Sequence, residues 1–192
     1  MLATHHKYDL KINLEDSTSP PLKATYSLSS SKLGSLHESL DEHLAMGFIH
    51  PSSSTHATLV LFVHKKDGSL CLCIDFQGLN KITKKDKYPL SRISNLLDAL
   101  SYAKVYTNID LRHAYYLVYI ADRDKWKTPL QTCYGFYKWL VMPFGLTNAL
   151  AAFQCFINTV FADLLDVYII VYLDNILIYS TNLASYNKFM QE

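Results

Sequence analysis

Two hairpin patterns limit the possible folds of this chain more than any other feature of its sequence. Residues 58–64 and 69–76 are short runs rich in apolar and β-branched side chains. The segment between them contains Asp-Gly, which is a strong hairpin signal. Residues 168–173 and 176–179 form a second pair, and we expect Asp174 and Asn175 at its tip. The chain is therefore expected to contain antiparallel sheet.

Helical patterns alternate with these strands. Leucines at 33, 36, 40 and 44 predict a helix, with serines 29–31 available as N-caps and Gly47 as the stop signal. Ser91 is the candidate N-cap of a second helix. This order predicts an α+β fold whose second half is an antiparallel sheet backed by helices. The other expected elements are helices around 93–100 and over 147–161, a strand at 104–110, a helical turn at 111–116 and two or three strands within 117–140.

Composition narrows the class of protein further. Hydrophobic residues make up 49% of the 192 residues and charged residues 18%, which indicates a folded globular chain. The four cysteines suit neither a zinc site nor a disulfide framework. No apolar signal core follows Met1, and the longest apolar run, at 167–179, is interrupted and too short to span a bilayer. We therefore expect a soluble intracellular protein with no membrane partner.

Two carboxylates are candidates for metal chemistry. Asp110 ends an expected strand, and Asp174 lies at an expected hairpin tip, so the fold can bring them together. Magnesium prefers one or two carboxylates with substrate phosphate oxygens, and a pair of such ions can activate a hydroxyl nucleophile and stabilise departing pyrophosphate. Aspartate is also common at strand ends and turns for structural reasons, and the spacing alone favours that explanation.

Five ordered motifs resemble the reverse transcriptases of gypsy-type LTR retrotransposons. Residues 171–180, Val-Tyr-Leu-Asp-Asn-Ile-Leu-Ile-Tyr-Ser, resemble the Tyr-x-Asp-Asp hairpin of these enzymes, and residues 140–149 resemble their Met-Pro-Phe-Gly loop. The resemblance implies the polymerase right-hand fold, with a ferredoxin-like palm. The remaining motifs lie at 62–70, 74–80 and 109–115. The implied divisions are an extended lead-in at 1–30, fingers at 31–88 and a palm at 89–192 with the catalytic hairpin at 167–180; the thumb, RNase H and integrase segments are expected to be missing.

The same resemblance implies an activity and residue roles. It implies RNA-directed DNA polymerisation by two-metal nucleotidyl transfer, with Mg²⁺ or alternatively Mn²⁺, on an RNA or DNA template-primer and deoxynucleotides. Asp110 and Asp174 match metal-binding catalytic aspartates, and Tyr115 matches the aromatic gate that excludes a ribose 2′-hydroxyl. Each position also has a structural explanation, such as core packing or a tight turn. The implied nucleotide contacts are Lys65, Lys66, Cys71, Leu111, Tyr115, Phe144 and Gly145.

The chain departs from the family pattern at its most important positions. Asn175 stands where the family has a third catalytic aspartate, and Cys71 and Gln77 stand where it has arginines. Loss of one preorganised electrostatic partner typically costs about 3–4 kcal/mol in the transition state. Cysteine cannot replace the arginine fork that grips phosphates. We therefore expect inefficient polymerisation.

Further departures share one chemical pattern. Each can arise from a C-to-T change on one DNA strand or the other, which would deplete arginine codons and spare lysine codons. The chain contains 15 lysines but only 3 arginines. We hypothesise a copy decayed by cytosine deamination or a related process. The further positions are His50, His64, Gln131 and Cys155 for arginine, Tyr116 for histidine, and Ser91 and Leu150 for proline.

Three functional hypotheses remain open from the sequence. The first is an active RNA-directed DNA polymerase domain, and the second is a catalytically silent remnant that at most binds nucleic acid. The third is another enzyme on a similar palm, such as a nucleotide cyclase. The fingers motif and the Met-Pro-Phe-Gly loop argue against the third, and Asn175 and Cys71 favour the second. A basic stretch at 81–87 either follows a template phosphate backbone or is an exposed face.

Overall fold

A computed structural model describes residues 5, 7–20, 28–54, 56–64, 66, 68, 70–89 and 93–189. The chain packs into two compact units, which we call unit 1 (residues 1–85 and 115–149) and unit 2 (residues 86–114 and 150–192). Each unit is discontinuous in sequence. The division into fingers and palm at residue 88 describes functional subdomains and stays a prediction.

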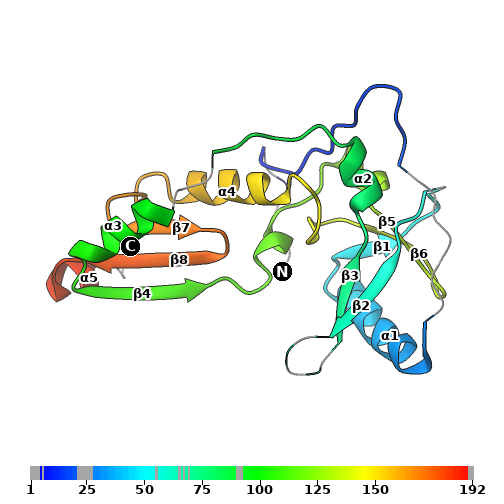
Figure 1. Ribbon diagram of the computed structural model, residues 1–192, viewed down its shortest axis with the longest axis horizontal. Coiled ribbons are helices and arrows are strands. Elements are labelled where there is room, and N and C mark those ends of the chain that lie inside the picture. The colour runs from blue at the N-terminus through cyan, green and yellow to red at the C-terminus, as the bar shows by residue number, and fades with distance from the viewer. Residues whose placement is uncertain are drawn as a thin grey trace. The chain divides into compact units, whose positions relative to one another are not determined.

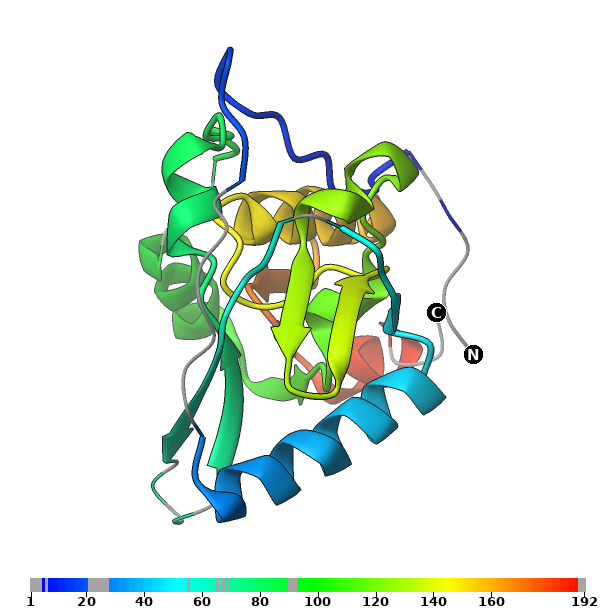
Figure 2. The ribbon, with the colours of Figure 1, turned by 90° about the vertical axis from the view of Figure 1, so that its right-hand side faces the viewer.

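Unit 1 contains one three-stranded sheet and one hairpin, both antiparallel. The sheet has the order β1-β6-β5, and β2 pairs with β3 in the predicted first hairpin. Figure 2 shows α1 passing beneath the β5–β6 hairpin, where the Tyr134 hydroxyl donates to the Leu33 carbonyl oxygen at 3.4 Å. The elements are α1 (Ser30–Ala45), β1 (Ile49–Pro51), β2 (Val60–His64), β3 (Leu70–Ile74), α2 (Gln77–Ile82), the 3-10 helix η2 (Asp122–Lys127), β5 (Pro129–Thr132) and β6 (Gly135–Trp139).

The leucine pattern of α1 explains its position. Leu36 and Leu40 are buried against unit 1, as residues one helical turn apart on one face should be. The helix ends at Ala45, and Gly47 follows with a φ of +72°, a conformation that glycine adopts without strain. The predicted helix and its stop signal are therefore confirmed.

The N-terminal segment is held against the core of unit 1. Leu10 and Ile12 are both 3% exposed, and the Leu10 N–H donates to the Tyr119 carbonyl oxygen at 2.7 Å. The Ile12 N–H donates to the buried Asp124 carboxylate at 2.9 Å, and Lys127 forms an ion pair with the same carboxylate at 2.6 Å. A buried charge pair therefore anchors this extended segment.

Unit 2 is built around the sheet β4-β8-β7, in which both pairings are antiparallel. Helices α3 and α5 contact β8, and Figure 1 shows α4 running alongside the same sheet. The predicted α+β class with a helix-backed antiparallel sheet is confirmed. The elements are α3 (Ile93–Tyr102), β4 (Val105–Asp110), α4 (Ala149–Val160), β7 (Ile169–Tyr172), β8 (Asn175–Ser180) and α5 (Leu183–Phe189). The 3-10 helix η1 (Ala114–Leu117) spans the boundary in sequence between the two units.

The structure corrects two local predictions. The second hairpin turns at Leu173 and Asp174, because Tyr172 pairs with Asn175, so Asn175 begins β8 rather than sharing the tip. The segment 117–140 contains η2 before its two strands, β5 and β6. The short elements β1, α2 and α5 were not predicted, because three to seven residues carry too little periodicity. The proposed cap Ser91 lies outside the described residues.

Within the described part of the chain, no helix has both the length and the apolar character that are needed to span a bilayer.

Candidate functional site

The predicted site residues fall into two groups, one on each unit. The positions predicted for catalysis lie in unit 2, and most positions predicted for nucleotide contact lie in unit 1. Lys65 lies outside the described residues, and its neighbour Lys66 is exposed in a turn. The unit 2 group is Asp110, Leu111, Asp174 and Asn175, and the unit 1 group is Lys66, Cys71, Tyr115, Phe144 and Gly145.

In unit 2, the end of β4 meets the tip of the β7–β8 hairpin. Asp110, the last residue of β4, is the Cα partner of Asn175, the first residue of β8. Directly opposed residues of an antiparallel pair share one face of the sheet, with Cβ atoms about 5 Å apart. The Leu111 N–H donates to the Asp174 carbonyl oxygen at 2.9 Å. The fold therefore brings Asp110 beside the turn that carries Asp174.

The Asn175 amide joins two neighbouring side chains. Its Oδ1 accepts from Asn108 Nδ2 at 3.0 Å, and its Nδ2 donates to Asp174 Oδ1 at 3.4 Å. Asn108 was not predicted, and only the strand register shows that it lies diagonally across from Asn175. An ionised aspartate at position 175 has no donor and would place a second negative charge beside Asp174. Asparagine at this position therefore adds no charge beside Asp174 and supplies it with a donor.

A buried glutamine supports the hairpin tip. Leu173 has a φ of +59°, which costs an L-residue about 1–2 kcal/mol. Its N–H donates to Gln154 Oε1 at 3.4 Å, while Gln154 Nε2 donates to Asn158 Oδ1 at 2.7 Å and to the Val171 carbonyl oxygen at 3.4 Å. Gln154 is 1% exposed. The sequence signal for this role was a single polar residue within the otherwise apolar stretch 149–157 of α4.

The carboxylates of unit 2 fit a sparse metal site. Among the described residues, no cluster of three or more His, Cys, Asp or Glu side chains could hold a metal ion. The exposed Asp110 carboxylate has no hydrogen-bond or ion-pair partner among those residues either, so it is available to a ligand. Magnesium commonly takes one or two carboxylates and completes its octahedron with water and substrate oxygens. Asp110 and Asp174 therefore suit one such ion better than two.

In unit 1, a loop before α4 presents an aromatic side chain and a glycine. The rings of Tyr115 and Phe144 lie 4.4 Å apart, and Phe144 is 57% exposed. Gly145 has a φ of +95°, and its carbonyl oxygen accepts from Asn80 Nδ2 at 2.7 Å. The Thr147 N–H donates to Asn80 Oδ1 at 2.8 Å. Asn80 therefore holds both ends of the loop tip; the motif at 74–80 contained it, but its role was not predicted.

Cys71 lies on β3 as a free, half-buried thiol opposite Val63. Its Sγ is 3.8 Å from the Leu72 carbonyl oxygen. Burial, and then the neighbouring Cys71 thiol, raise the pKa of Cys73 above its usual range. Position 71 therefore presents a weakly polar thiol and not a cation.

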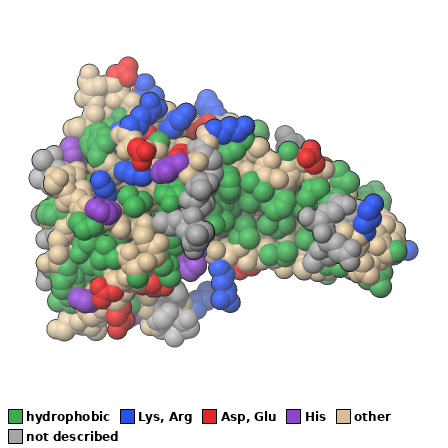
Figure 3. Space-filling model, turned by 180° about the vertical axis from the view of Figure 1, so that it is seen from behind, with side chains coloured by type: hydrophobic (Ala, Val, Ile, Leu, Met, Phe, Trp, Pro, Cys, Tyr) green, Lys and Arg blue, Asp and Glu red, His purple; other side chains and the backbone are tan. Residues whose placement is uncertain are grey.

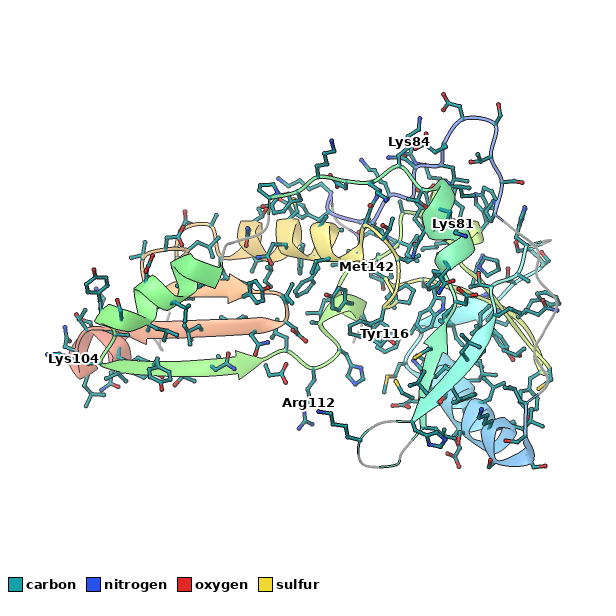
Figure 4. The ribbon with its side chains drawn as sticks, in the orientation of Figure 1. Lys81, Lys84, Lys104, Arg112, Tyr116 and Met142 are labelled. Atoms are coloured by element: carbon teal, nitrogen blue, oxygen red, sulfur yellow. The ribbon has the colours of Figure 1, made fainter. Side chains whose placement is uncertain are left out.

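The basic stretch at 81–87 is an exposed face of the chain. Figure 3 shows several Lys and Arg side chains in the upper part of its view, and Lys81 and Lys84 are labelled in Figure 4. Lys84 forms an ion pair with Asp16 at 3.0 Å, and this contact raises its pKa. Part of the positive charge is thus offset by the N-terminal segment. The remaining lysines of the stretch, Lys85 and Lys87, are exposed.

Sequence comparisons give consistent matches. The family described as Reverse transcriptase (RNA-dependent DNA polymerase) matches residues 63–192. The Transposon Tf2-7 polyprotein of Schizosaccharomyces pombe is 34% identical over 167 residues, and the Transposon Tf2-3 polyprotein of the same yeast is 33% identical. Each alignment covers 87% of this chain but only 12% of the polyprotein. The chain therefore spans about an eighth of these relatives.

Solved structures show the same fold. The foamy viral protease-reverse transcriptase in complex with RNA/DNA hybrid matches with a TM-score of 0.83 and 19% identity, covering 99% of this chain and 26% of the viral one. The dRH form of that enzyme in complex with ds DNA matches with a TM-score of 0.82 and 21% identity, covering 95% and 32%. At these identities the likeness establishes the architecture alone.

Proposed function

The chain belongs to the reverse transcriptase (RNA-dependent DNA polymerase) family, and from this membership we propose that it is the polymerase domain of a retrotransposon polyprotein with an impaired catalytic site. The observation that carries the proposal is the pairing of Asp110 with Asn175, beside the turn that bears Asp174. Two carboxylates and one amide stand together there. The family pattern has three carboxylates at these positions.

Asp110 and Asp174 would hold magnesium, or manganese in its place. Bound there, the ion supplies Lewis-acid stabilisation of phosphoryl oxygens and of the attacking hydroxyl. The two carboxylates contribute the negative charge that retains it. Asn175 contributes none, and its amide also occupies an oxygen of Asp174 through the hydrogen bond at 3.4 Å.

The impairment follows from charge. Removal of one preorganised electrostatic partner costs about 3–4 kcal/mol, which lowers the rate at least a few hundredfold. Cys71 adds to the deficit, because a thiol makes no bidentate hydrogen bonds to a triphosphate. The proposed nucleotide contacts are otherwise those implied by the resemblance, at Lys65, Lys66, Leu111, Tyr115, Phe144 and Gly145, with Tyr115 as the ribose gate.

The proposed partners are a template-primer and deoxynucleotides. Support comes from the foamy viral relatives, which are described in complex with RNA/DNA hybrid and with ds DNA. The remaining segments of a polyprotein are proposed to act with this chain, because the transposon relatives are much longer.

Primer extension on an RNA template tests the proposal. The chain as given and the double variant Asn175→Asp with Cys71→Arg are compared in magnesium and in manganese, each also joined to the following segment of a Tf2 polyprotein. We expect extension only in the double variant. Asn182→Asp is the matched control, since it adds the same charge to exposed Asn182 of unit 2. Equal extension by the chain as given would contradict the impairment.

Asn175 and Cys71 also favour a second candidate, a catalytically silent domain that binds nucleic acid. Fluorescence anisotropy with a labelled RNA/DNA hybrid distinguishes it from the first. Salt-sensitive binding by both forms, without extension by either, supports the silent domain. Extension by the double variant supports the impaired polymerase.

A further inference from the structure

Unit 1 contains an apolar cavity that its proposed role in polymerisation does not explain. Its volume is about 400 Å³. Its wall includes Cys71 and Cys73 of β3, the rings of Tyr116, Trp139 and Phe144, and His43 of α1. We propose that this cavity binds a small, neutral, planar aromatic molecule.

The wall of the cavity offers an anion neither a lysine nor an arginine among its described residues. Among the described residues that line it, none is Lys, Arg, Asp or Glu. Cys71 and Cys73 are two residues apart on β3, so their side chains share one face of the strand, and both thiols are free. Burial raises the pKa of Cys73, which keeps that thiol protonated at neutral pH. A phosphate in this cavity would lose its hydration without a compensating partner.

The aromatic side chains provide surfaces for a flat ligand. Tyr116 and Trp139 stack with ring centroids 5.6 Å apart and an angle of 19° between planes. His43 meets both rings edge-on, at 6.0 Å and 5.2 Å. Offset and edge-to-face arrangements are those that aromatic groups prefer, and a further ring can extend them. Tyr116, labelled in Figure 4, thus lies within an aromatic cluster.

The polar groups of the cavity are few. Burial raises the pKa of Tyr116 to about 12, so its hydroxyl stays protonated over the physiological range. A predominantly apolar cavity with few polar groups is typical of small-molecule sites, and its volume lies near the lower end of their range. It therefore suits a ligand of one or two rings. Phe144, 57% exposed, is the most accessible of the three rings.

The cavity shares Cys71, Phe144 and Gly145 with the proposed nucleotide contacts, yet the ligand class differs. A deoxynucleotide triphosphate requires cations, whereas this cavity requires the absence of charge. The inference stands on the wall of unit 1 and is independent of any polymerisation by unit 2.

Binding of the neutral fluorophore N-phenyl-1-naphthylamine to the full chain tests the inference, without metal or nucleic acid. We expect saturable fluorescence enhancement, together with quenching of Trp139 measured in a Trp126→Phe background. 1-Naphthol should displace the probe, and 1-naphthyl phosphate should not. Because the two competitors share a ring system, their difference reports charge alone.

Matched variants locate the site. Cys71→Arg puts a cation in the wall and should weaken probe binding about tenfold or more, whereas Cys133→Arg, at an exposed cysteine outside the cavity, should leave it unchanged. Phe144→Ala removes an exposed ring from the cavity and should also weaken probe binding. This variant tests the inference if Cys71→Arg does not fold. Equal effects of the two arginine variants, or displacement by the phosphate as strong as by 1-naphthol, would overturn the inference. Loss of primer extension leaves this readout untouched, so the two proposals fail separately.

Discussion

Asp110 and Asn175 face each other across the antiparallel strands β4 and β8, and the Asn175 amide donates to Asp174 at 3.4 Å. The residue at position 175 is therefore hydrogen-bonded to the Asp174 carboxylate and lies opposite Asp110 in the strand register. As asparagine, it removes one negative charge from the cluster and supplies a donor. The change that we propose impairs metal binding is also expected to stabilise the metal-free fold.

Asn175→Asp is expected to lower the free energy of unfolding by about 1–2 kcal/mol in the absence of divalent ions. The variant loses the donor to Asp174 and gains a like charge. Millimolar magnesium should restore part of the loss, because a bound cation offsets the repulsion. Urea unfolding with and without magnesium measures both effects.

Asn182→Asp is the control for that experiment. Asn182 Oδ1 accepts from the Ser185 N–H at 2.8 Å just before α5, a position where aspartate serves equally well. The stability of the Asn182→Asp variant should equal that of the parent chain and should not depend on magnesium. A variant at position 175 as stable as the parent would show that the three side chains are too far apart to interact.

Gly145→Ala is expected to destabilise the chain by about 1–2 kcal/mol through backbone strain. The φ of +95° is unfavourable for alanine, whereas the added Cβ would lie 3.5 Å from Phe76 Cδ2, an ordinary contact. Gly34→Ala, at an exposed position of α1 with open space around it, should stabilise by about 0.5–1 kcal/mol. Thermal unfolding of both variants measures these two changes in stability, which should have opposite signs. A change of the same sign in both variants would refute the argument from φ.

Asp124→Asn is expected to destabilise unit 1 by about 3 kcal/mol or more. It breaks a buried ion pair with Lys127 and weakens the acceptor for the Ile12 N–H. Amide hydrogen exchange at Ile12 should accelerate together with the loss in urea stability. Asp122→Asn removes a carboxylate that is 81% exposed, although its partner Lys125 is 12% exposed, and should cost much less than Asp124→Asn. Unaltered exchange at Ile12 would mean that the segment is held by its apolar contacts alone.

Tyr116 is expected to make the chain less stable at high pH. Its pKa is raised from 10.0 to about 12 in the folded state, chiefly by burial. The unfolded chain therefore releases this proton first, so the contribution is complete below about pH 10 and is lost as the pH rises to about 12. The loss is expected to reach about 2–3 kcal/mol.

Tyr116→Phe should abolish that part of the pH dependence. Urea unfolding of both proteins at about pH 9 and about pH 11.5 measures it, and ionisation of the other tyrosines and the lysines cancels in the comparison. If the free energy of unfolding changed equally with pH in the two proteins, the pKa of Tyr116 would not be raised by folding.

Local patterns predicted much of this molecule. Five ordered motifs predicted the family, and the match over residues 63–192 confirms it. Helix α1 and the presence of both hairpins were also predicted, because leucine spacing and turn residues are signals that depend only on residues close together in the sequence. The turn at Leu173 and Asp174 was misplaced by one residue, since Asp-Asn and Leu-Asp both allow a tip and only strand register distinguishes them. The catalytic and nucleotide-binding roles stay predictions.

The sequence by itself determined the family, the longer helices and both hairpins, and the departure at position 175. Tertiary structure alone decided which side chains support the candidate site. Asn108 reaches Asn175 across 67 positions, and Asn80 reaches Gly145 across 65. The physical reason is that a hydrogen bond acts over about 3 Å in space and leaves no periodic trace along the chain. Its two partners therefore become recognisable only when the segments that carry them are placed side by side.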